Sequence, residues 1–300
     1  MTGTFPEGIY FLPFLESITL SHNELRGTLP AQLFKVLSNL AYIDYESNHF
    51  TGTVPLDWMQ ANKVYYMDVG SNLLRGTLAE NVGSLVDAKT IWMSRNNFTG
   101  TLPSEIGSLN SISTFGISGN NLEGHVPLTI GNWRYITILC LQQNKFIGPI
   151  PSVIGNFGAT LLDLELQSNH FTGTLPEELY QLTSLNYLGV SDNHLIGSLS
   201  SSVSKLTSSE SILMDHNAFH GTIPPEIGNL KFLQQFEIQA NNFSGSMPAT
   251  LCTISMTHQY FSRIIADCAP EGSRIGSAQF ECSCCTQCCQ ADGTSCFPPK

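Results

Sequence analysis

The chain has 300 residues, with 13 basic and 24 acidic side chains, which give a formal net charge of −11. This balance argues against nucleic acid as a partner, because phosphate binding needs clustered lysine and arginine. The sequence contains no run of about 18 apolar residues, so it predicts no membrane-spanning helix.

The first 14 residues are predicted to belong to a repeat whose strand is missing. Gly3-Thr4-Phe5-Pro6 matches the G-x-[IL]-P ending of the repeats that follow. No basic segment followed by an apolar one precedes it, so no signal peptide is predicted. We therefore expect a truncated gene model or a fragment, with a cap, a signal peptide or a membrane anchor encoded upstream.

From Leu15 onward the chain repeats the phrase L-x-x-L-x-L-x-x-N-x-[LF]-x-G-x-[IL]-P ten times. Alternation such as Thr90-Ile91-Trp92-Met93 predicts a short strand in each copy, with one face directed inward. The asparagine that ends each strand is expected to hydrogen-bond backbone groups of its own and neighbouring coils. A fixed period of 24 or 25 residues indicates a stacked repeat, anchored at Asn23, Asn48, Asn72, Asn96, Asn120, Asn144, Asn169, Asn193, Asn217 and Asn241.

This phrase resembles the plant-type variant of the leucine-rich repeat family. The resemblance implies an α/β repeat solenoid, a right-handed superhelix with a parallel sheet on its concave face and short helical segments on its convex face. Three parts are predicted: a partial repeat at 1–14, ten leucine-rich repeats at 15–250, and a cysteine-rich C-terminal cap and tail at 251–300. The ninth copy is weak, because Ser209 replaces its first leucine, and we expect a looser coil there.

Eight of the nine cysteines follow the last repeat, and we predict that they form disulfides in an oxidising compartment. The cluster from Cys282 to Cys289 has an alternative interpretation as a zinc or soft-metal site. Adjacent cysteines and the lack of a nearby histidine favour disulfides, so no metal or other cofactor is predicted. Cys252 and Cys268 are expected to form the disulfide of the cap. The full set is Cys252, Cys268, Cys282, Cys284, Cys285, Cys288, Cys289 and Cys296.

The tail, with Glu281-Cys282-Ser283-Cys284-Cys285 followed by Cys288-Cys289, resembles the ending of diatom leucine-rich repeat proteins. That resemblance implies repeats outside the cell, often tethered by an upstream membrane helix. Asn97-Phe98-Thr99 and Asn242-Phe243-Ser244 fit the N-glycosylation sequon, although the repeat itself can produce this tripeptide without a glycan. We predict glycosylation at Asn97 and Asn242.

Equivalent positions on neighbouring strands should form columns on the concave face, about 4.8 Å apart. One region combines aromatic with acidic side chains, and a second, nearer the C-terminus, repeats the acidic bias. Exposed aromatic residues are enriched at binding hot spots, and stacked carboxylates should attract a cationic group. The alternative is that the acidic residues are solvated positions that keep the protein soluble. The predicted ligand-binding residues are Tyr42, Asp44, Glu46, Tyr66, Asp68, Trp92, Asp163, Glu165, Tyr187, Asp215 and Glu237.

No catalytic motif is present, neither a phosphate-binding glycine loop nor a nucleophile elbow nor a zinc-protease helix, so we predict no enzyme activity. The leading hypothesis is a non-catalytic recognition module, extracellular or at the cell surface, that binds a peptide, protein or glycan. The resemblance to plant-type receptor ectodomains implies a receptor-like role with a co-receptor. The alternative is a secreted structural cell-wall protein or an inhibitor of a secreted polysaccharide hydrolase.

Overall fold

The computed structural model describes residues 1–61, 63–257, 263–268, 280–290 and 296–297. The chain divides into two compact units, Met1–Phe146 and Ile147–Lys300. In both units the chain builds one coil per repeat, and each coil adds a three-residue strand to a parallel main sheet. A second strand of the coil joins a second parallel sheet, and a short helix follows it. The predicted leucine-rich repeat solenoid is confirmed.

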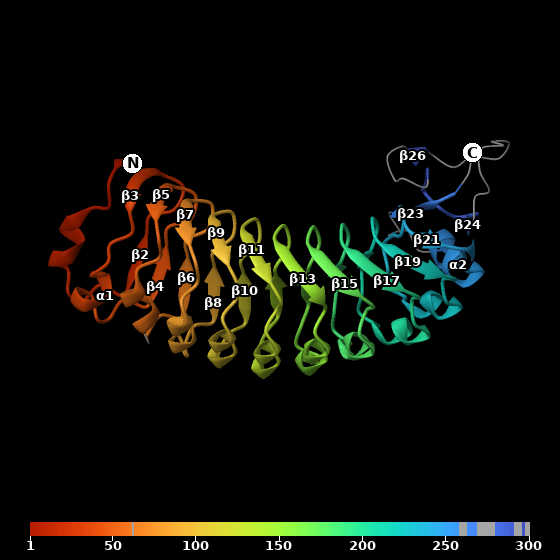
Figure 1. The fold of residues 1–300 in the computed structure, drawn as a ribbon, viewed down its shortest axis with the longest axis horizontal. Coiled ribbons are helices and arrows are strands. Elements are labelled where there is room, and N and C mark those ends of the chain that lie inside the picture. The colour runs from red at the N-terminus through yellow and green to blue at the C-terminus, as the bar shows by residue number, and fades with distance from the viewer. Residues whose placement is uncertain (62, 258–262, 269–279, 291–295, 298–300) are drawn as a thin grey trace. The chain divides into compact units, whose positions relative to one another are not determined.

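The main sheet of the N-terminal unit stacks one strand per coil in chain order (Figure 1). The middle residue of each strand, such as Ile43 or Met67, is buried, whereas its two neighbours face outward. This is the predicted alternation, because successive side chains of a strand point to opposite faces. The strands are β2 (Ser17–Thr19), β4 (Tyr42–Asp44), β6 (Tyr66–Asp68), β8 (Thr90–Trp92), β10 (Thr114–Gly116) and β12 (Ile138–Cys140).

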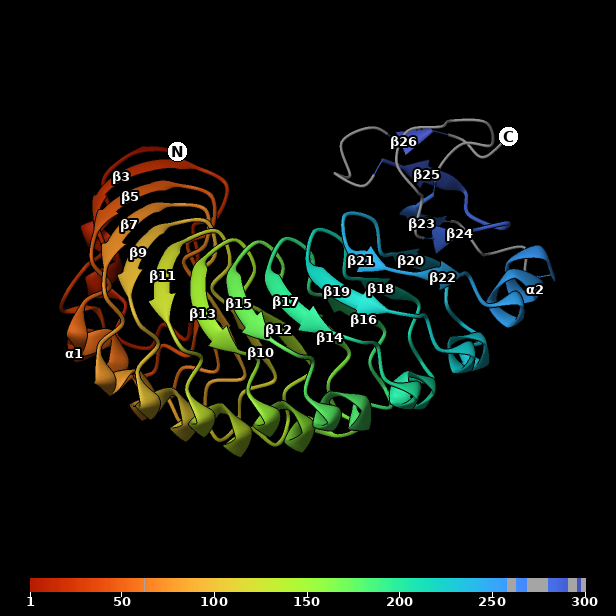
Figure 2. The same cartoon turned by 45° about the vertical axis from the view of Figure 1, so that its right-hand side comes forward.

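The second sheet of this unit is built from the N-x-[LF]-x-G part of each repeat, and the short helices gather along one side of the stack (Figure 2). The sheet strands are β1 (Thr2–Gly3), β3 (Glu24–Thr28), β5 (His49–Gly52), β7 (Leu73–Gly76), β9 (Asn97–Gly100), β11 (Asn121–Gly124) and the start of β13 (Lys145–Pro149). The helices, all 3₁₀ except α1, are η1 (Glu7–Phe11), α1 (Leu33–Val36), η2 (Leu56–Gln60), η3 (Glu80–Ser84), η4 (Ser104–Ser108) and η5 (Leu128–Asn132).

The asparagine ladder forms as expected. Asn120 Nδ2 donates to the carbonyls of Ile117 and Ser118 in its own coil and of Met93 in the preceding coil, at 3.0–3.2 Å. Its Oδ1 accepts the amide of Phe98 at 3.0 Å. One side chain therefore satisfies four backbone groups that the stack removes from water, which explains why the repeat needs an amide at this position.

The C-terminal unit repeats this arrangement and adds strands from the cysteine-rich segment. Its main sheet runs through β14 (Asp163–Glu165), β16 (Tyr187–Gly189), β18 (Ser211–Leu213), β20 (Gln235–Glu237), β23 (Arg263–Asp267), β25 (Gln287–Cys289) and β26 (Cys296–Phe297). The other strands are β15 (His170–Gly173), β17 (His194–Gly197), β19 (Ala218–Gly221), β21 (Asn242–Phe243), β22 (Gly245–Ser246) and β24 (Phe280–Glu281). The helices are η6 (Ser152–Phe157), η7 (Glu177–Gln181), η8 (Ser201–Lys205), η9 (Pro225–Asn229) and α2 (Ala249–Thr257).

The weak ninth repeat forms the same elements as its neighbours. Ser209 is fully buried, and its hydroxyl donates to the carbonyl of Leu185 at 2.7 Å. A hydrogen bond to the preceding coil thus takes the place of the apolar contact that leucine would make.

The cysteine-rich segment covers the end of the main sheet. β23 pairs in parallel with β20, and Asp267 accepts the amides of Ala240 and Asn241 at 2.9 and 3.1 Å. In earlier coils, the amides at these two positions donate to backbone carbonyls of the following coil. Here the Asp267 carboxylate takes the place of those carbonyls. Residues 258–262, 269–279, 291–295 and 298–300 of the predicted cap and tail lie outside the described residues.

The eight C-terminal cysteines form disulfides, not a metal site. The expected Cys252–Cys268 pair is wrong: Cys252 bonds Cys284, and Cys268 bonds Cys288. The reason is strand pairing, because β25 runs beside β23 with Ala266 opposite Cys288, whereas Cys252 lies in α2. The other two bonds are Cys282–Cys285 and Cys289–Cys296.

Candidate functional site

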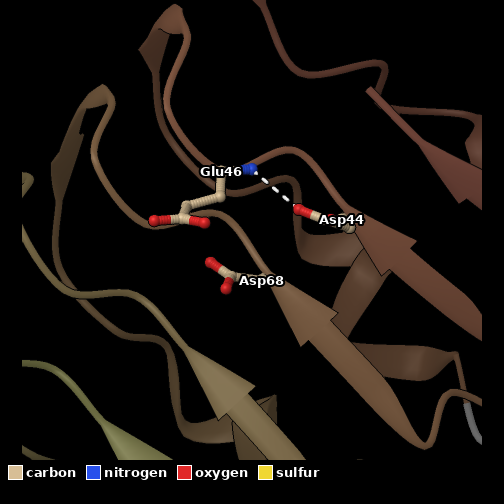
Figure 3. A group of neighbouring side chains, drawn as sticks. All are labelled: Asp44, Glu46 and Asp68. Atoms are coloured by element: carbon tan, nitrogen blue, oxygen red, sulfur yellow. Dashed lines mark hydrogen bonds between the residues drawn. The ribbon is translucent and has the colours of Figure 1, made fainter. Parts of the chain in front are cut away.

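The predicted binding residues of the N-terminal unit lie together on the outward face of its main sheet. Tyr42 and Asp44 are the outward residues of β4, and Tyr66 and Asp68 are those of β6 in the same register. Glu46 follows β4 at the next outward position. We call Asp44, Glu46 and Asp68 the acidic cluster (Figure 3).

The two tyrosines form a stacked pair. Their ring centroids are 4.4 Å apart and the ring planes differ by 9°, which follows from identical positions on adjacent parallel strands. Tyr65, which was not among the predicted residues, adds a third ring 6.1 Å from Tyr42 and is 47% exposed. The adjacent Tyr65-Tyr66 pair in the sequence was the signal that could have indicated it.

The acidic cluster brings three carboxylates to one place. One oxygen from each lies within 4.8 Å of the others. Asp44 accepts the hydroxyl of Ser21 at 2.8 Å and the amide of Glu46 at 3.2 Å, and Asp68 accepts the amide of Gly70 at 2.8 Å. These neutral donors orient the two aspartates and leave the negative charge of the cluster in place.

Burial dominates the electrostatics of Asp68, which is 8% exposed. Burial raises the pKa of its carboxyl group to about 6; the Gly70 amide opposes this shift, and the charges of Glu46 and Asp44 add to it. Burial and the charge of Asp68 also raise the pKa of Tyr66. The site therefore holds more negative charge than its surroundings can stabilise.

Little positive charge offsets the cluster. His22 Nε2 lies 3.6 Å from the Glu46 carboxylate, but its side chain is 73% exposed and is charged only when protonated. Within the described part of the chain, no lysine or arginine forms an ion pair with these three carboxylates. An ammonium, a guanidinium or a divalent cation would each be attracted there, since carboxylate oxygens are hard ligands.

Trp92, the third aromatic residue predicted for the site, turns toward the next strand. It lies on β8 directly opposite Gly116 of β10. A Cβ built on Gly116 would lie 1.9 Å from both Cε3 and Cζ3 of Trp92, so the indole fills the space that any other residue at 116 would occupy. Trp92 thus extends the site toward β10, away from the tyrosine pair.

The second predicted set, in the C-terminal unit, is partnered internally. Glu237 pairs with Arg263 at 3.2 Å and accepts the side-chain amide of Gln235 at 2.6 Å. Asp215 accepts the hydroxyl of Ser191 and lies 2.7 Å from His216 Nδ1. A ligand would have to displace these partners, so the N-terminal unit holds the stronger candidate.

The remaining residues of this set surround Tyr187. Asp163 lies opposite Tyr187 on the adjacent strand, and Glu165 accepts the side-chain amide of Gln167 at 3.2 Å. Burial, followed by the charges of Glu165, Glu237, Asp215 and Asp163, raises the pKa of Tyr187 to about 12.

The two sequon asparagines begin strands of the second sheets. Asn97 starts β9 and Asn242 starts β21, and both are exposed. The sequon hydroxyls of Thr99 and Ser244 each donate to a glycine carbonyl of the preceding coil at 3.4 Å. Both asparagines therefore belong to the second sheets and are not among the residues of the main sheet.

Comparison with known proteins identifies the repeats and their structural relatives. A family model described as Leucine Rich Repeat matches residues 88–109 and 160–182. Over 81 residues, 26% of this chain and 9% of the relative, the sequence is 33% identical to Receptor-like protein 39 of Arabidopsis thaliana.

Two solved receptor structures resemble the fold. The plant peptide hormone receptor RGFR1 in complex with RGF2 matches 88% of this chain with a TM-score of 0.83 and 26% identity. The Arabidopsis receptor kinase HAESA, in complex with the peptide hormone IDA and the co-receptor SERK1, matches 99% with a TM-score of 0.78 and 25% identity. This chain spans 41% and 46% of their lengths, respectively. Among the described residues, no helix is long and apolar enough to cross a membrane.

Proposed function

Because this chain is a plant-type leucine-rich repeat protein, we propose that it is a non-catalytic recognition module that works outside the cell and binds a peptide. Its binding site is the acidic cluster with the Tyr42–Tyr66 pair, on the main-sheet face of the N-terminal unit. The ligand group that this site receives is cationic, a lysine, an arginine or an amino terminus. As in the HAESA complex, a co-receptor is the second partner that we propose.

The observation that carries this proposal is the uncompensated charge of the acidic cluster. Three carboxylates within 4.8 Å of one another are held by a hydroxyl and backbone amides, without a lysine or arginine partner among the described residues. A cation from a ligand would supply the missing charge. The tyrosine pair beside the cluster offers aromatic surface, which strengthens cation binding and buries area at low entropic cost.

Four disulfides and the two receptor structures support a place outside the cell. Disulfides persist in oxidising compartments and are rare in the cytosol. RGFR1 is a peptide hormone receptor, and HAESA was solved with the peptide hormone IDA. The alternative inhibitor role would be supported instead if the purified protein inhibited a secreted polysaccharide hydrolase at nanomolar concentration.

A positional-scanning library of synthetic peptides tests the proposal. The purified chain should enrich peptides with lysine or arginine, and the Asp44→Asn, Asp68→Asn double variant should weaken their binding roughly tenfold or more, since each tenfold step is about 1.4 kcal/mol. Glu123→Gln, which removes an exposed carboxylate from β11 in the second sheet, is the matched control. Enrichment without a basic preference, or an equal loss in the control, would count against the site.

A further inference from the structure

The main-sheet face of the N-terminal unit changes character between β6 and β8. On β4 and β6 the outward residues are the tyrosine pair and the two aspartates. On β8 and β10 they are Thr90 and Trp92, then Thr114 and Gly116, and on β12 Ile138 stands in the column of the tyrosines. The acidic half of the face is therefore followed by an uncharged half.

Gly116 creates the centre of the uncharged half. Its φ lies outside the left-handed region, so the backbone at 116 would accept alanine without strain. Glycine in a strand is destabilising relative to alanine and is typical of a place where another group approaches closely. Here that group is the Trp92 ring, because a Cβ at 116 would lie 1.9 Å from two of its carbons.

Asp68 and Trp92 lie directly opposite each other on neighbouring strands. The indole lies over β10, so one to two strand spacings separate its ring from the Asp68 carboxylate. This corresponds to about 5–10 Å. Side chains two residues apart on one face of an extended peptide are about 6.6 Å apart. One extended peptide can therefore place one side chain on the acidic half of the face and the side chain two residues further along on the uncharged half.

We propose that this face is a two-part site that selects an extended peptide with a basic side chain and a large apolar side chain two residues apart. The acidic cluster binds the basic residue, and Trp92, held over Gly116, binds the apolar one. Gly116 is a positioning residue, which acts only by leaving room for the indole. This inference rests on the proposed function and names the class of ligand that the same site takes.

The probes are fluorescein-labelled glycine peptides that contain one arginine and one leucine, separated by zero to four glycines. The peptide with one intervening glycine should bind tightest, about tenfold more tightly than the same peptide with glycine in place of leucine. Affinity that does not depend on the spacing would overturn the inference. If no arginine peptide binds, the proposed function itself fails, and the two failures are thereby distinguished.

Gly116→Ala tests the positioning role. It should abolish the advantage of the leucine peptide and keep the arginine-dependent binding, whereas Asp68→Asn should weaken the arginine contribution. In a Trp92→Ala background, Gly116→Ala should have no further effect, because the ring that it displaces is absent. Equal losses for both peptides, or additive effects of the two substitutions, would contradict the role.

Two readouts separate positioning from damage to the fold. Trp58 and Trp133 are fully buried, so a red shift of tryptophan emission and stronger acrylamide quenching in Gly116→Ala report the displacement of Trp92. Gly189→Ala is the matched control, since Gly189 has the same repeat position in β16, and a Cβ there would lie 2.6 Å from Gln167 Oε1. This control should leave both peptide affinities and the emission unchanged.

Discussion

Replacing Asp68 with asparagine should stabilise the N-terminal unit at neutral pH and remove part of its pH dependence. The pKa of Asp68 is about 6 in the folded protein against 3.8 for the unfolded chain. The folded state therefore binds the Asp68 proton more tightly than the unfolded chain does. The free energy of folding that this proton binding contributes is fully present below pH 3.8 and is lost as the pH rises through about 6. This difference in pKa sets an upper limit of roughly 3 kcal/mol, which solvent screening of the carboxylate reduces.

Asparagine matches the shape of the protonated carboxyl group and keeps an oxygen for the Gly70 amide. The variant and the wild type should therefore unfold at similar urea concentrations near pH 3.5. At pH 7.5 the free energy of unfolding of the variant should be higher by up to about 3 kcal/mol. Trp58, Trp92 and Trp133 all lie in the N-terminal unit, so tryptophan emission follows its unfolding.

Asp87→Asn, at an exposed position of the same unit, is the control and should show no comparable change with pH. A stability difference for Asp68→Asn that stays constant from pH 4 to 7.5 would refute the reasoning. Asp68→Asn is expected to raise stability at neutral pH but to weaken peptide binding, and both effects have the same cause. A buried carboxylate without a cationic partner costs folding free energy, and such residues cluster at functional sites.

Three further predictions concern the scaffold. Asn120→Ala should lower the free energy of unfolding by about 3 kcal/mol, because buried backbone groups lose their partners; a loss below about 0.5 kcal/mol in urea titrations would contradict the ladder's role. Mass spectrometry of an unreduced digest should find Cys252 linked to Cys284, and a Cys252–Cys268 peptide would disprove the strand pairing. Asn97→Gln and Asn242→Gln should each remove one glycan mass from protein secreted by eukaryotic cells, and unchanged masses would show that the sequons are unoccupied.

The repeat made most of the fold predictable. Each coil is specified by local patterns, in which alternation buries residues such as Ile91 and the asparagine closes the turn. Neighbouring coils have the same pattern, so their strands must pair in register. Among the described residues, nine non-glycine residues have a positive φ, such as Arg95 one position before Asn96, and this reasoning did not predict them. The positive φ at the position before the ladder asparagine is imposed by the stacking of the coils. Gly119 is the one residue at this position whose type indicates that conformation in the sequence.

The candidate site was predictable as a set of columns but not as a geometry. The columns placed Tyr42 beside Tyr66 and Asp44 beside Asp68, and these contacts form because parallel strands in register repeat side-chain positions. The column pattern in the sequence provided no reason to prefer one acidic set over the other. Only the folded chain distinguishes them, since the partner of Glu237 is Arg263, which comes from the cysteine-rich segment.

The sequence by itself determined the coil, its period and the residues that face outward, because these depend on contacts that recur at a fixed spacing. Tertiary structure decided the contacts that occur once. β25 beside β23 set the disulfide between Cys268 and Cys288, and the Trp92 ring occupies the space that a side chain at position 116 would fill. Contacts that recur with the repeat can be predicted from the sequence of any one copy. Contacts that occur once depend on which two copies, or which segment of the cap, lie side by side in the folded chain.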